Sequence, residues 1–416
     1  MPLRSKFHQL VASALTVILF AGLPLFISPV QAQAPQWVHT WIAPPSTLPP
    51  DANALENPSS HIENQTLRLI AHTSVGGDKL RLRIANTHGE TLLRVAGVTV
   101  ALQENGDQIQ SNTLTTVTFT GKNAVMVPRG AVMLSDSIEF KVPAEANLSI
   151  SLFFDHASPF VTSHFNANQT AWLAPGNQLA AKQLKDSTTR TTWDFVTAVE
   201  VQTKDNVHVI AAVGDSITDG YLSTINDNNR WPNYLARRLR QELPKRQFAV
   251  LNAGISGNRV LRETSPRFGE NLLARMDRDV FSIQHLQYIV LLEGINDIGM
   301  GSRDPSQAVS AEDLINGYRQ VIARAHAKDI KVFGATLLPY QGAAYFSDAG
   351  ELIRQQVNQW IRTSGEFDGV VDFEGAVRDP QLPSQIRRDF TKDNLHPNDA
   401  GYQAMAEAID LTFFTP

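Results

Sequence analysis

The sequence predicts an antiparallel β-sandwich followed by an α/β domain that is built on a parallel sheet. From about residue 66 to 202, apolar and polar residues alternate with a period of two, which is typical of half-buried strands. From residue 207 onward, short apolar runs alternate with stretches of helical periodicity, which indicates a parallel sheet covered by helices on both faces. A length of 416 residues suits two such domains. We expect a leader at 1–32, a β-sandwich domain at 33–204 and an α/β domain at 205–416.

The first residues resemble a targeting segment. Arg4 and Lys6 form a basic start, an apolar stretch follows over about 10–27, and the small residues that end at Ala32 fit a cleavage site. An uncleaved anchor helix is the alternative, against which Pro24 argues. We therefore expect a secreted or periplasmic protein without stable membrane insertion after cleavage.

Composition narrows the classes of partner. The chain is 43% hydrophobic and 19% charged, with a formal net charge of −5, so neither nucleic acid nor an anionic membrane is expected as a partner. The chain has no cysteine, which excludes disulfides, thiolate metal sites and a lipid anchor on cysteine.

The β-rich half begins with a proline-rich stretch over 35–50 that contains Trp37 and Trp41. We predict an extended arm packed on a domain surface, with stacking of the two tryptophans on a sugar as the alternative. Alternating strands follow, and glycine- and asparagine-rich turns separate them, as at 76–78 and 105–107. This pattern favours an antiparallel sandwich, of which the jelly roll is one form.

The α/β half follows a short predicted linker at 203–206. Its expected strands lie at 207–213, 247–251, 288–292, 330–335 and 369–373. Its expected helices include 231–243, 349–364 and 400–413, and a fourth begins after the predicted N-cap Ser310.

A serine directly follows the first expected strand of this half, in the run Gly214-Asp215-Ser216. The carboxyl ends of parallel strands are where α/β proteins build their sites. Ser216 is therefore a candidate nucleophile. Its own backbone N–H, at the start of a helix, could face a developing oxyanion.

Two further oxyanion donors are predicted after the second and third strands. Gly257, in the block 252–258, lets the backbone approach a ligand closely, and Asn296, in the block 293–297, carries a side-chain amide. With Ser216 they would form a three-donor oxyanion hole, in which the loss of one donor costs about 3 kcal/mol of transition-state stabilisation.

The fourth block, Asp393 to Pro397, supplies the remaining chemistry. His396 can accept the serine proton and return it to the leaving alcohol, and Asp393 can fix the imidazole tautomer. Pro397 suits the first turn of the closing helix. We interpret all four blocks as lying at the carboxyl ends of strands. No further ligands converge on Asp393 and His396, so neither a metal nor a cofactor is predicted.

Neighbouring polar residues are given structural roles. We expect Asp215 and Asp219 to hold the turn after the first strand, Asp297 to brace the third block, and Glu293 to be buried or hydrogen-bonded near the site. Pocket lining is the alternative for four others, which are Arg230, Trp231, Asn258 and Arg259.

The four blocks resemble the motifs of the SGNH/GDSL hydrolase superfamily, which appear as Gly214-Asp215-Ser216-Ile217, Gly257, Gly294-Ile295-Asn296-Asp297, and Asp393 with His396. The resemblance implies a three-layer α/β/α flavodoxin-like fold and metal-independent ester hydrolysis through an acyl-enzyme. It assigns catalysis to Ser216, Asp393 and His396, and the oxyanion hole to Ser216, Gly257 and Asn296. The chain further resembles a secreted subgroup of this superfamily, which has a β-rich domain ahead of the hydrolase. This resemblance lies in the segments 37–41, 83–86 and 398–402.

We therefore expect a secreted serine ester hydrolase that acts on short-chain esters or carbohydrate acetyl esters. Its partner would be an ester substrate or an acylated carbohydrate. An acyltransferase on the same scaffold and a non-catalytic, secreted glycan-binding protein are the alternatives. The acyl chain, the alcohol, the role of the β domain and the oligomeric state stay open.

Overall fold

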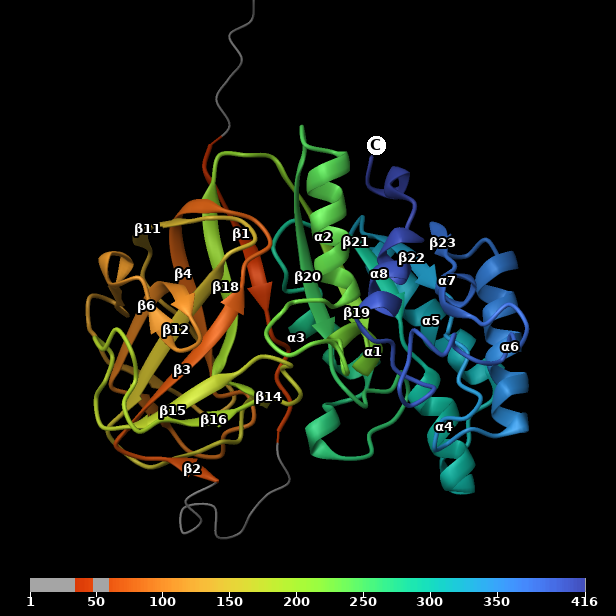
Figure 1. Cartoon of the computed structure of the whole chain (residues 1–416), viewed down its shortest axis with the longest axis horizontal. Coiled ribbons are helices and arrows are strands. Elements are labelled where there is room, and N and C mark those ends of the chain that lie inside the picture. Colours follow the sequence, from red (N-terminus) through yellow and green to blue (C-terminus); the bar gives the residue numbers. More distant parts are fainter. Residues whose placement is uncertain (1–33, 48–59, 416) are drawn as a thin grey trace, which may run out of the picture. The chain divides into compact units, whose positions relative to one another are not determined.

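The computed structural model describes residues 34–47 and 60–415 (Figure 1). The predicted leader at 1–32, its cleavage site and part of the proline-rich stretch lie outside these residues. The strands of the β-rich region, residues 34–203, run from red to yellow-green in Figure 1, and the α/β domain, from residue 207 on, runs from green to blue. Among the described residues, no helix has the length and apolarity needed to cross a membrane.

The β-rich region is built on two antiparallel sheets. The first has the order β1-β18-β4-β10, with β11 also on β4. Its strands are β1 (Gln36–Ile42), β4 (Gly77–Ala85), β10 (Val132–Leu134), β11 (Ile138–Val142) and β18 (Val196–Thr203). The second has the order β16-β15-β3-β12-β6-β7, with β8 also on β6. Its strands are β3 (Gln65–His72), β6 (Gly97–Asn105), β7 (Gln108–Ile109), β8 (Thr115–Val117), β12 (Asn147–Phe154), β15 (Ala171–Pro175) and β16 (Thr188–Arg190).

The described residues of this region also form three short strand pairs: β2 (His61–Ile62) with β13 (Ser158–Pro159), β5 (Leu93–Val95) with β9 (Val125–Val127), and β14 (Ser163–His164) with β17 (Trp193–Asp194). A 3-10 turn, η1, covers Ser111–Thr113. The period-two pattern is confirmed, since Leu80, Leu82 and Ile84 are fully buried while Arg81 and Arg83 between them are half-buried.

The start of the proline-rich stretch is a strand of the first sheet, so its prediction as a surface arm is wrong. β1 pairs antiparallel with β18, from Gln36 opposite Thr203 to Ile42 opposite Ala198. Trp41 is buried and packs edge-on against Trp193, with ring centroids 5.1 Å apart. Trp41 therefore stabilises the β-rich core. This burial favours packing over stacking on a sugar as the role of Trp41.

The α/β domain contains one parallel sheet of five strands in the order β20-β19-β21-β22-β23. These are β19 (Val207–Gly214), β20 (Gln247–Gly254), β21 (Leu286–Leu292), β22 (Lys331–Ala335) and β23 (Gly369–Val371). The strand order reverses at β19, because β20 lies on one side of it and β21 on the other. Such reversal points are where open α/β sheets hold their ligands.

Helices cover both faces of this sheet, as the three-layer prediction requires. α2 (Trp231–Glu242) and α7 (Phe373–Val377) both contact α8 (Asp399–Glu407). The second group comprises α3 (Leu272–Asp279), α4 (Ile295–Arg303), α5 (Ala311–His326) and α6 (Asp348–Thr363), joined through α5 and α6. The remaining elements are short: α1 (Ser216–Asp219), η2 (Pro266–Phe268), η3 (Pro305–Gln307) and η4 (Leu411–Phe414).

Element boundaries differ from the predictions at the end of the chain. The expected strand 369–373 stops at Val371, because Asp372 caps α7 by accepting a hydrogen bond from the Gly375 N–H. The expected helix 400–413 is α8 followed by the separate turn η4. α3 and α4 have no counterpart among the predictions. Their eight and nine residues are too short to stand out as periodic patterns.

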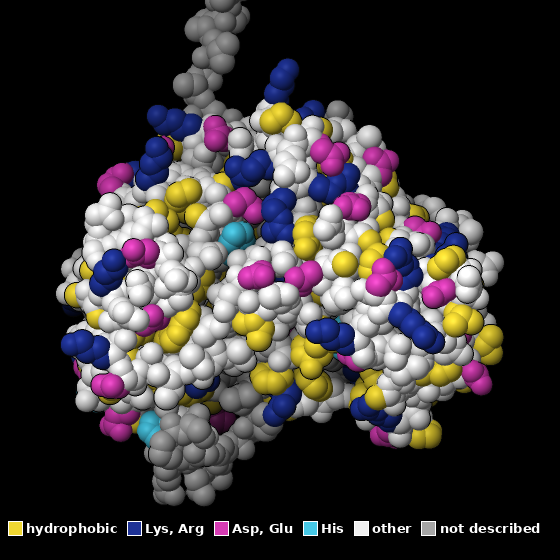
Figure 2. All heavy atoms as spheres, in the orientation of Figure 1, with side chains coloured by type: hydrophobic (Ala, Val, Ile, Leu, Met, Phe, Trp, Pro, Cys, Tyr) yellow, Lys and Arg dark blue, Asp and Glu magenta, His cyan; other side chains and the backbone are white. Residues whose placement is uncertain are grey.

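The two regions join through the turn after Thr203 and share one hydrophobic core. Residues from Ala34 onward form one compact unit, so the proposed domain boundary near residue 204 stays a prediction. On the face shown in Figure 2, basic and acidic side chains of the described residues are interspersed, in keeping with a net charge of −5.

Candidate active site

The turn after β19 presents Ser216 at the reversal point of the sheet. The Asp215 carboxylate caps α1 by accepting a hydrogen bond of 3.0 Å from the Ile217 N–H, and Gly220 ends the helix in the left-handed conformation. Ser216 is the first residue of α1, so its N–H has no acceptor within the helix. The register sets Gly214 beside Gly254 of β20 and Leu292 of β21, so the first three predicted blocks meet at one edge.

Ser216, His396 and Asp393 form a continuous hydrogen-bonded series. Ser216 Oγ lies 2.8 Å from His396 Nε2, and His396 Nδ1 lies 2.7 Å from Asp393 Oδ2. Asp393 Oδ1 also accepts the backbone N–H groups of Leu395 and His396, at 3.0 and 2.9 Å. Partial burial acts to raise the pKa of Asp393, but its hydrogen bonds with His396 outweigh burial and lower that pKa to about 2. Asp393 therefore stays a carboxylate beside the imidazole.

The surroundings of the fourth block differ from two predictions. The block does not follow a strand, because α7 and a long loop separate it from β23. Pro397 does not lie in the first turn of the closing helix either, since Asn398 is the N-cap of α8 and accepts a hydrogen bond from the Gly401 N–H. His396 is instead fixed by its own turn, where Thr391 Oγ1 donates to the His396 carbonyl at 2.8 Å.

One aromatic neighbour of His396 was absent from the predicted site. The Tyr221 ring meets the imidazole edge-on, with centroids 4.7 Å apart, and it is partly exposed. The Tyr221 carbonyl accepts a hydrogen bond of 2.7 Å from the Tyr402 hydroxyl, which ties this position to α8. Tyr221 lies directly after the Gly220 turn, and only that closeness to Ser216 could have indicated it.

The two glycines of the second block have different surroundings. Gly254 ends β20, and a Cβ atom there would lie 2.4 Å from the backbone nitrogen of Asp219, so glycine allows α1 to pack on the strand end. Gly257 has a φ of +78°, and a Cβ atom would lie 2.4 Å from the Phe268 ring. The Gly257 N–H has no hydrogen-bond partner among the described residues. This donor is therefore available to a ligand.

Asn296 lies in the first turn of α4, and its side chain links two elements. Its Nδ2 donates to the Asn258 carbonyl at 3.0 Å, and its Oδ1 accepts from the Tyr345 hydroxyl at 3.3 Å. An amide nitrogen carries two hydrogens, so one remains for a ligand. Asn296 is thus oriented from both ends of its amide.

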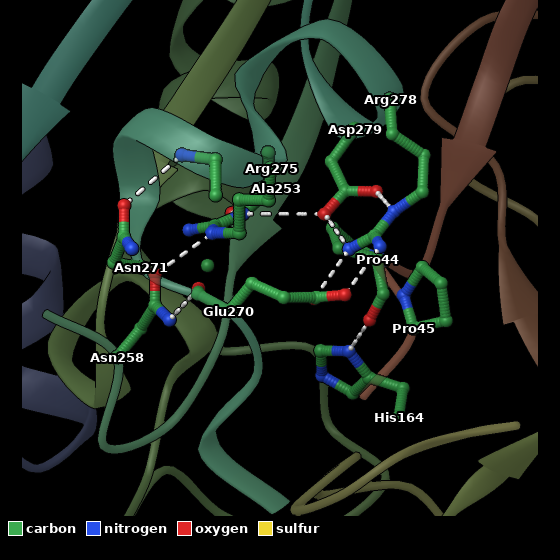
Figure 3. Close-up of polar contacts among 12 residues, drawn as sticks. Pro44, Pro45, His164, Ala253, Asn258, Glu270, Asn271, Arg275, Arg278 and Asp279 are labelled. Atoms are coloured by element: carbon green, nitrogen blue, oxygen red, sulfur yellow. Dashed lines mark hydrogen bonds and ion pairs between the residues drawn. The ribbon is translucent and has the colours of Figure 1, made fainter. Parts of the chain in front are cut away.

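Arg275 of α3 connects the strand ends beneath the site and was not predicted. It donates to the carbonyls of Gly214 and Ala253, at 3.2 and 2.9 Å, and to Asn258 Oδ1 at 2.7 Å. The Asn258 amide in turn donates to the Glu270 carbonyl, and Figure 3 shows the Arg275 and Asn258 side chains meeting. A buried arginine thereby holds the ends of β19 and β20 to the loop that carries Gly257.

Three buried carboxyl groups surround the nucleophile turn. Burial raises the pKa of Asp215 to about 7 and that of Glu293 to about 8, and both Glu293 oxygens lack a hydrogen-bond partner among the described residues. Burial also raises the pKa of Asp297 to about 6. Asp297 accepts the N–H groups of Val260 and Leu261, at 2.8 and 3.2 Å, so it braces the chain just after the second block against the third block.

The four residues considered as pocket lining are all buried: Arg230, Trp231, Asn258 and Arg259. Arg230 donates to the Asp219 carbonyl at 2.8 Å, and Arg259 donates to Gln307 Oε1 at 2.7 Å. Arg230 thus supports the end of α1, and Arg259 joins the loop after β20 to η3. Within residues 34–47 and 60–415, no group of three histidine or acidic side chains could hold a metal ion.

Comparison with known proteins identifies the α/β domain. Residues 212–404 match the model of the GDSL-like Lipase/Acylhydrolase family, whereas no curated protein matches the chain. Among solved structures, the chain is similar to an alpha/beta hydrolase enzyme from the metagenome of Lake Arreo, Spain, at 23% identity over 50% of this chain and 94% of that one, with a TM-score of 0.40. It is also similar to an acetylxylan esterase from Geobacillus stearothermophilus, at 21% identity over 50% of this chain and 94% of that one, with a TM-score of 0.38. The family model therefore assigns a GDSL-like lipase/acylhydrolase domain to residues 212–404.

Proposed function

We propose that the protein is a secreted serine esterase that cleaves carboxylic esters through an acyl-enzyme on Ser216. The observation that carries this proposal is the series Ser216–His396–Asp393, with hydrogen bonds of 2.8 and 2.7 Å. This is the arrangement in which a serine is activated by a base that a third group orients.

In the first half of the reaction, Ser216 Oγ attacks the acyl carbon and its proton passes to His396 Nε2. His396 Nδ1 keeps its own proton, directed at the Asp393 carboxylate, which stabilises the imidazolium. Collapse of the tetrahedral intermediate breaks the ester C–O bond, and the alcohol leaves with the proton from Nε2. Water then enters and attacks the acyl carbon as it loses a proton to the same nitrogen. The bond between the acyl carbon and Ser216 Oγ breaks, Nε2 returns that proton to Oγ, and the acid is released.

The oxyanion would be held by the N–H groups of Ser216 and Gly257 and by the Asn296 amide. The free Gly257 N–H and the second amide hydrogen of Asn296 support this assignment. Each donor is expected to contribute about 3 kcal/mol to the transition state.

Short acyl esters, including carbohydrate acetates, are the proposed substrates. Ser216 is only 7% exposed, and such restricted access to its hydroxyl favours a small acyl group. The partly exposed Tyr221 ring next to His396 offers a flat apolar surface on which the alcohol part, such as a sugar ring, could pack. The leader expected at 1–32 is the basis for proposing secretion.

Hydrolysis of a series of p-nitrophenyl esters, from acetate to long acyl chains, tests this function. The enzyme is the chain from residue 33 onward, compared with Ser216→Ala and with Ser137→Ala, an exposed serine of the β-rich region. We expect turnover of acetate that declines with chain length, is lost in Ser216→Ala and is unchanged in Ser137→Ala. Equal rates for Ser216→Ala and the parent would overturn the proposal. Product analysis with added alcohols would show whether acyl transfer competes with hydrolysis.

A further inference from the structure

A histidine of the β-rich region reaches the helix that carries Ser216. His164 of β14 is buried, with its Nε2 2.9 Å from Asp219 Oδ1 and its Nδ1 2.8 Å from the Pro44 carbonyl oxygen. Figure 3 shows the His164 ring directed at Pro44. Asp219 is the last residue of α1, three residues after Ser216.

Both ring nitrogens of His164 face acceptors, which fixes its protonation. A carbonyl oxygen only accepts, so Nδ1 carries a proton, and an ionised Asp219 requires a second proton on Nε2. Burial alone would lower the pKa of His164, but the charge and hydrogen bond of Asp219 outweigh burial and raise it, while Arg230 acts to lower it. His164 and Asp219 thus form a buried, charge-assisted pair.

The other oxygen of Asp219 holds the second block. Asp219 Oδ2 accepts the Ser256 N–H at 3.0 Å and the Ser256 hydroxyl at 2.6 Å. Ser256 directly precedes Gly257. One carboxylate therefore connects the helix of the nucleophile to the loop of a proposed oxyanion donor, and His164 holds that carboxylate in place.

Other bonds from the same β-rich segment reach the same turn. The Asn168 side-chain amide donates to the Gly220 carbonyl. Arg230 donates a hydrogen bond of 2.8 Å to the Asp219 carbonyl, and it also donates to the Ala167 carbonyl. The segment around 164–168 thus contacts the end of α1 in two ways. One is through the Asp219 side chain, and the other is through the carbonyl groups of Asp219 and Gly220.

We propose that His164 is a positioning residue for the ester-hydrolysis site, through which the β-rich region keeps Ser216 and Gly257 in register. This inference rests on the proposed function. Its physical basis is that a displacement of about 1 Å between reacting groups can cost about a hundredfold in rate. Without the imidazolium, the buried Asp219 would lose its hydrogen-bonded counter-charge and would hold Ser256 less firmly.

The test compares His164→Ala and His164→Gln with the parent in p-nitrophenyl acetate hydrolysis. Active sites are counted by stoichiometric p-nitrophenol release from diethyl p-nitrophenyl phosphate, so misfolded protein does not contribute to kcat. We expect kcat per active site to fall about tenfold or more in His164→Ala while KM changes little. Glutamine can place an amide N–H near the position of Nε2, so His164→Gln should recover part of this loss.

His39→Gln is the matched control for loosening of the junction between the regions. His39 of β1 is also buried, and its Nδ1 accepts the Gln284 N–H of the α/β domain at 3.3 Å, but it touches neither Asp219 nor Ser256. In His39→Gln, the thermal midpoint of unfolding should fall, while kcat per active site should equal that of the parent.

The outcomes separate the two proposals. A folded parent without esterase activity would overturn the proposed function, and the positioning role with it. An active parent with an unchanged kcat in His164→Ala would overturn the positioning role alone. An equal loss of kcat in His39→Gln and His164→Ala would also overturn it, since general loosening would then explain both.

Discussion

The side-chain amide of Asn296 donates a hydrogen bond of 3.0 Å to the carbonyl oxygen of Asn258. Asn258 directly follows Gly257, so this bond joins two of the three proposed oxyanion donors. Asn296 stands on α4 after β21, and Gly257 stands on the loop after β20. The bond therefore holds donors from two strand ends at a constant spacing before any substrate arrives, as preorganised stabilisation of an oxyanion requires.

Asn296→Ala should lower kcat for p-nitrophenyl acetate by about 10²- to 10³-fold, because an oxyanion donor and its link to Asn258 are both removed. KM should change much less, since the ground-state carbonyl carries little of the charge. Tyr345→Phe is the control, because it removes only the 3.3 Å bond to Asn296 Oδ1. A similar kcat for Asn296→Ala and the parent would exclude Asn296 from the oxyanion hole.

Asp393→Asn should lower kcat by about 10³-fold or more, because an amide in place of the carboxylate favours the wrong imidazole tautomer and no longer stabilises the imidazolium. Asp389→Asn is a suitable control, since that carboxylate pairs with Arg387 on an exposed part of the same loop. Steady-state kinetics at neutral pH would measure both. Retained activity in Asp393→Asn would point to another orienting group.

The sequence predicted which residues would meet at the candidate site because each block has a recognisable pattern. Ser216, Gly257 and Asn296 come after apolar runs, and parallel strands bring their carboxyl ends to one edge. Asp393 and His396 are three residues apart, so their contact was local and needed no knowledge of the fold. The position of this last block in the fold was harder to predict, because the block lies on a loop. The path of that loop to Ser216 depends on tertiary packing.

The supporting residues could not be predicted in the same way. Arg275 lies on a helix of eight residues, and Tyr221 lies on a loop, so neither has a pattern that separates it from surface residues. His164 is 55 residues from Asp219 in sequence, and only the packing of the β-rich region on the α/β domain brings the two together. Contacts of this kind are set by tertiary structure rather than by local periodicity.

Arg275→Met should lower the free energy of unfolding by about 3–5 kcal/mol, because the change removes the arginine donor from the buried acceptors of Ala253 and Asn258 and one of the donors to the Gly214 carbonyl. Arg319→Met, which breaks an exposed pair with Glu366, should have a far smaller effect. Urea titration followed by tryptophan fluorescence would compare them. Equal stability of the two variants would show that the strand ends are held without Arg275.

Glu293→Gln should reduce the loss of stability between about pH 5 and pH 8. Burial raises the pKa of Glu293 to about 8 in the folded protein, whereas a glutamate in an unfolded chain titrates near about 4.3. Between these values the folded state retains a proton that the unfolded state has released, so the free energy of unfolding falls as the pH rises. Glutamine does not ionise, so its variant lacks this contribution, while Asp215 and Asp297 still act in the same direction.

Thermal midpoints across this range should therefore have a shallower slope in Glu293→Gln than in the parent and in Glu312→Gln, which removes an exposed carboxylate of α5. Parallel slopes for Glu293→Gln and the parent would mean that Glu293 is ionised in the folded protein throughout, stabilised by Arg275 at 3.7 Å.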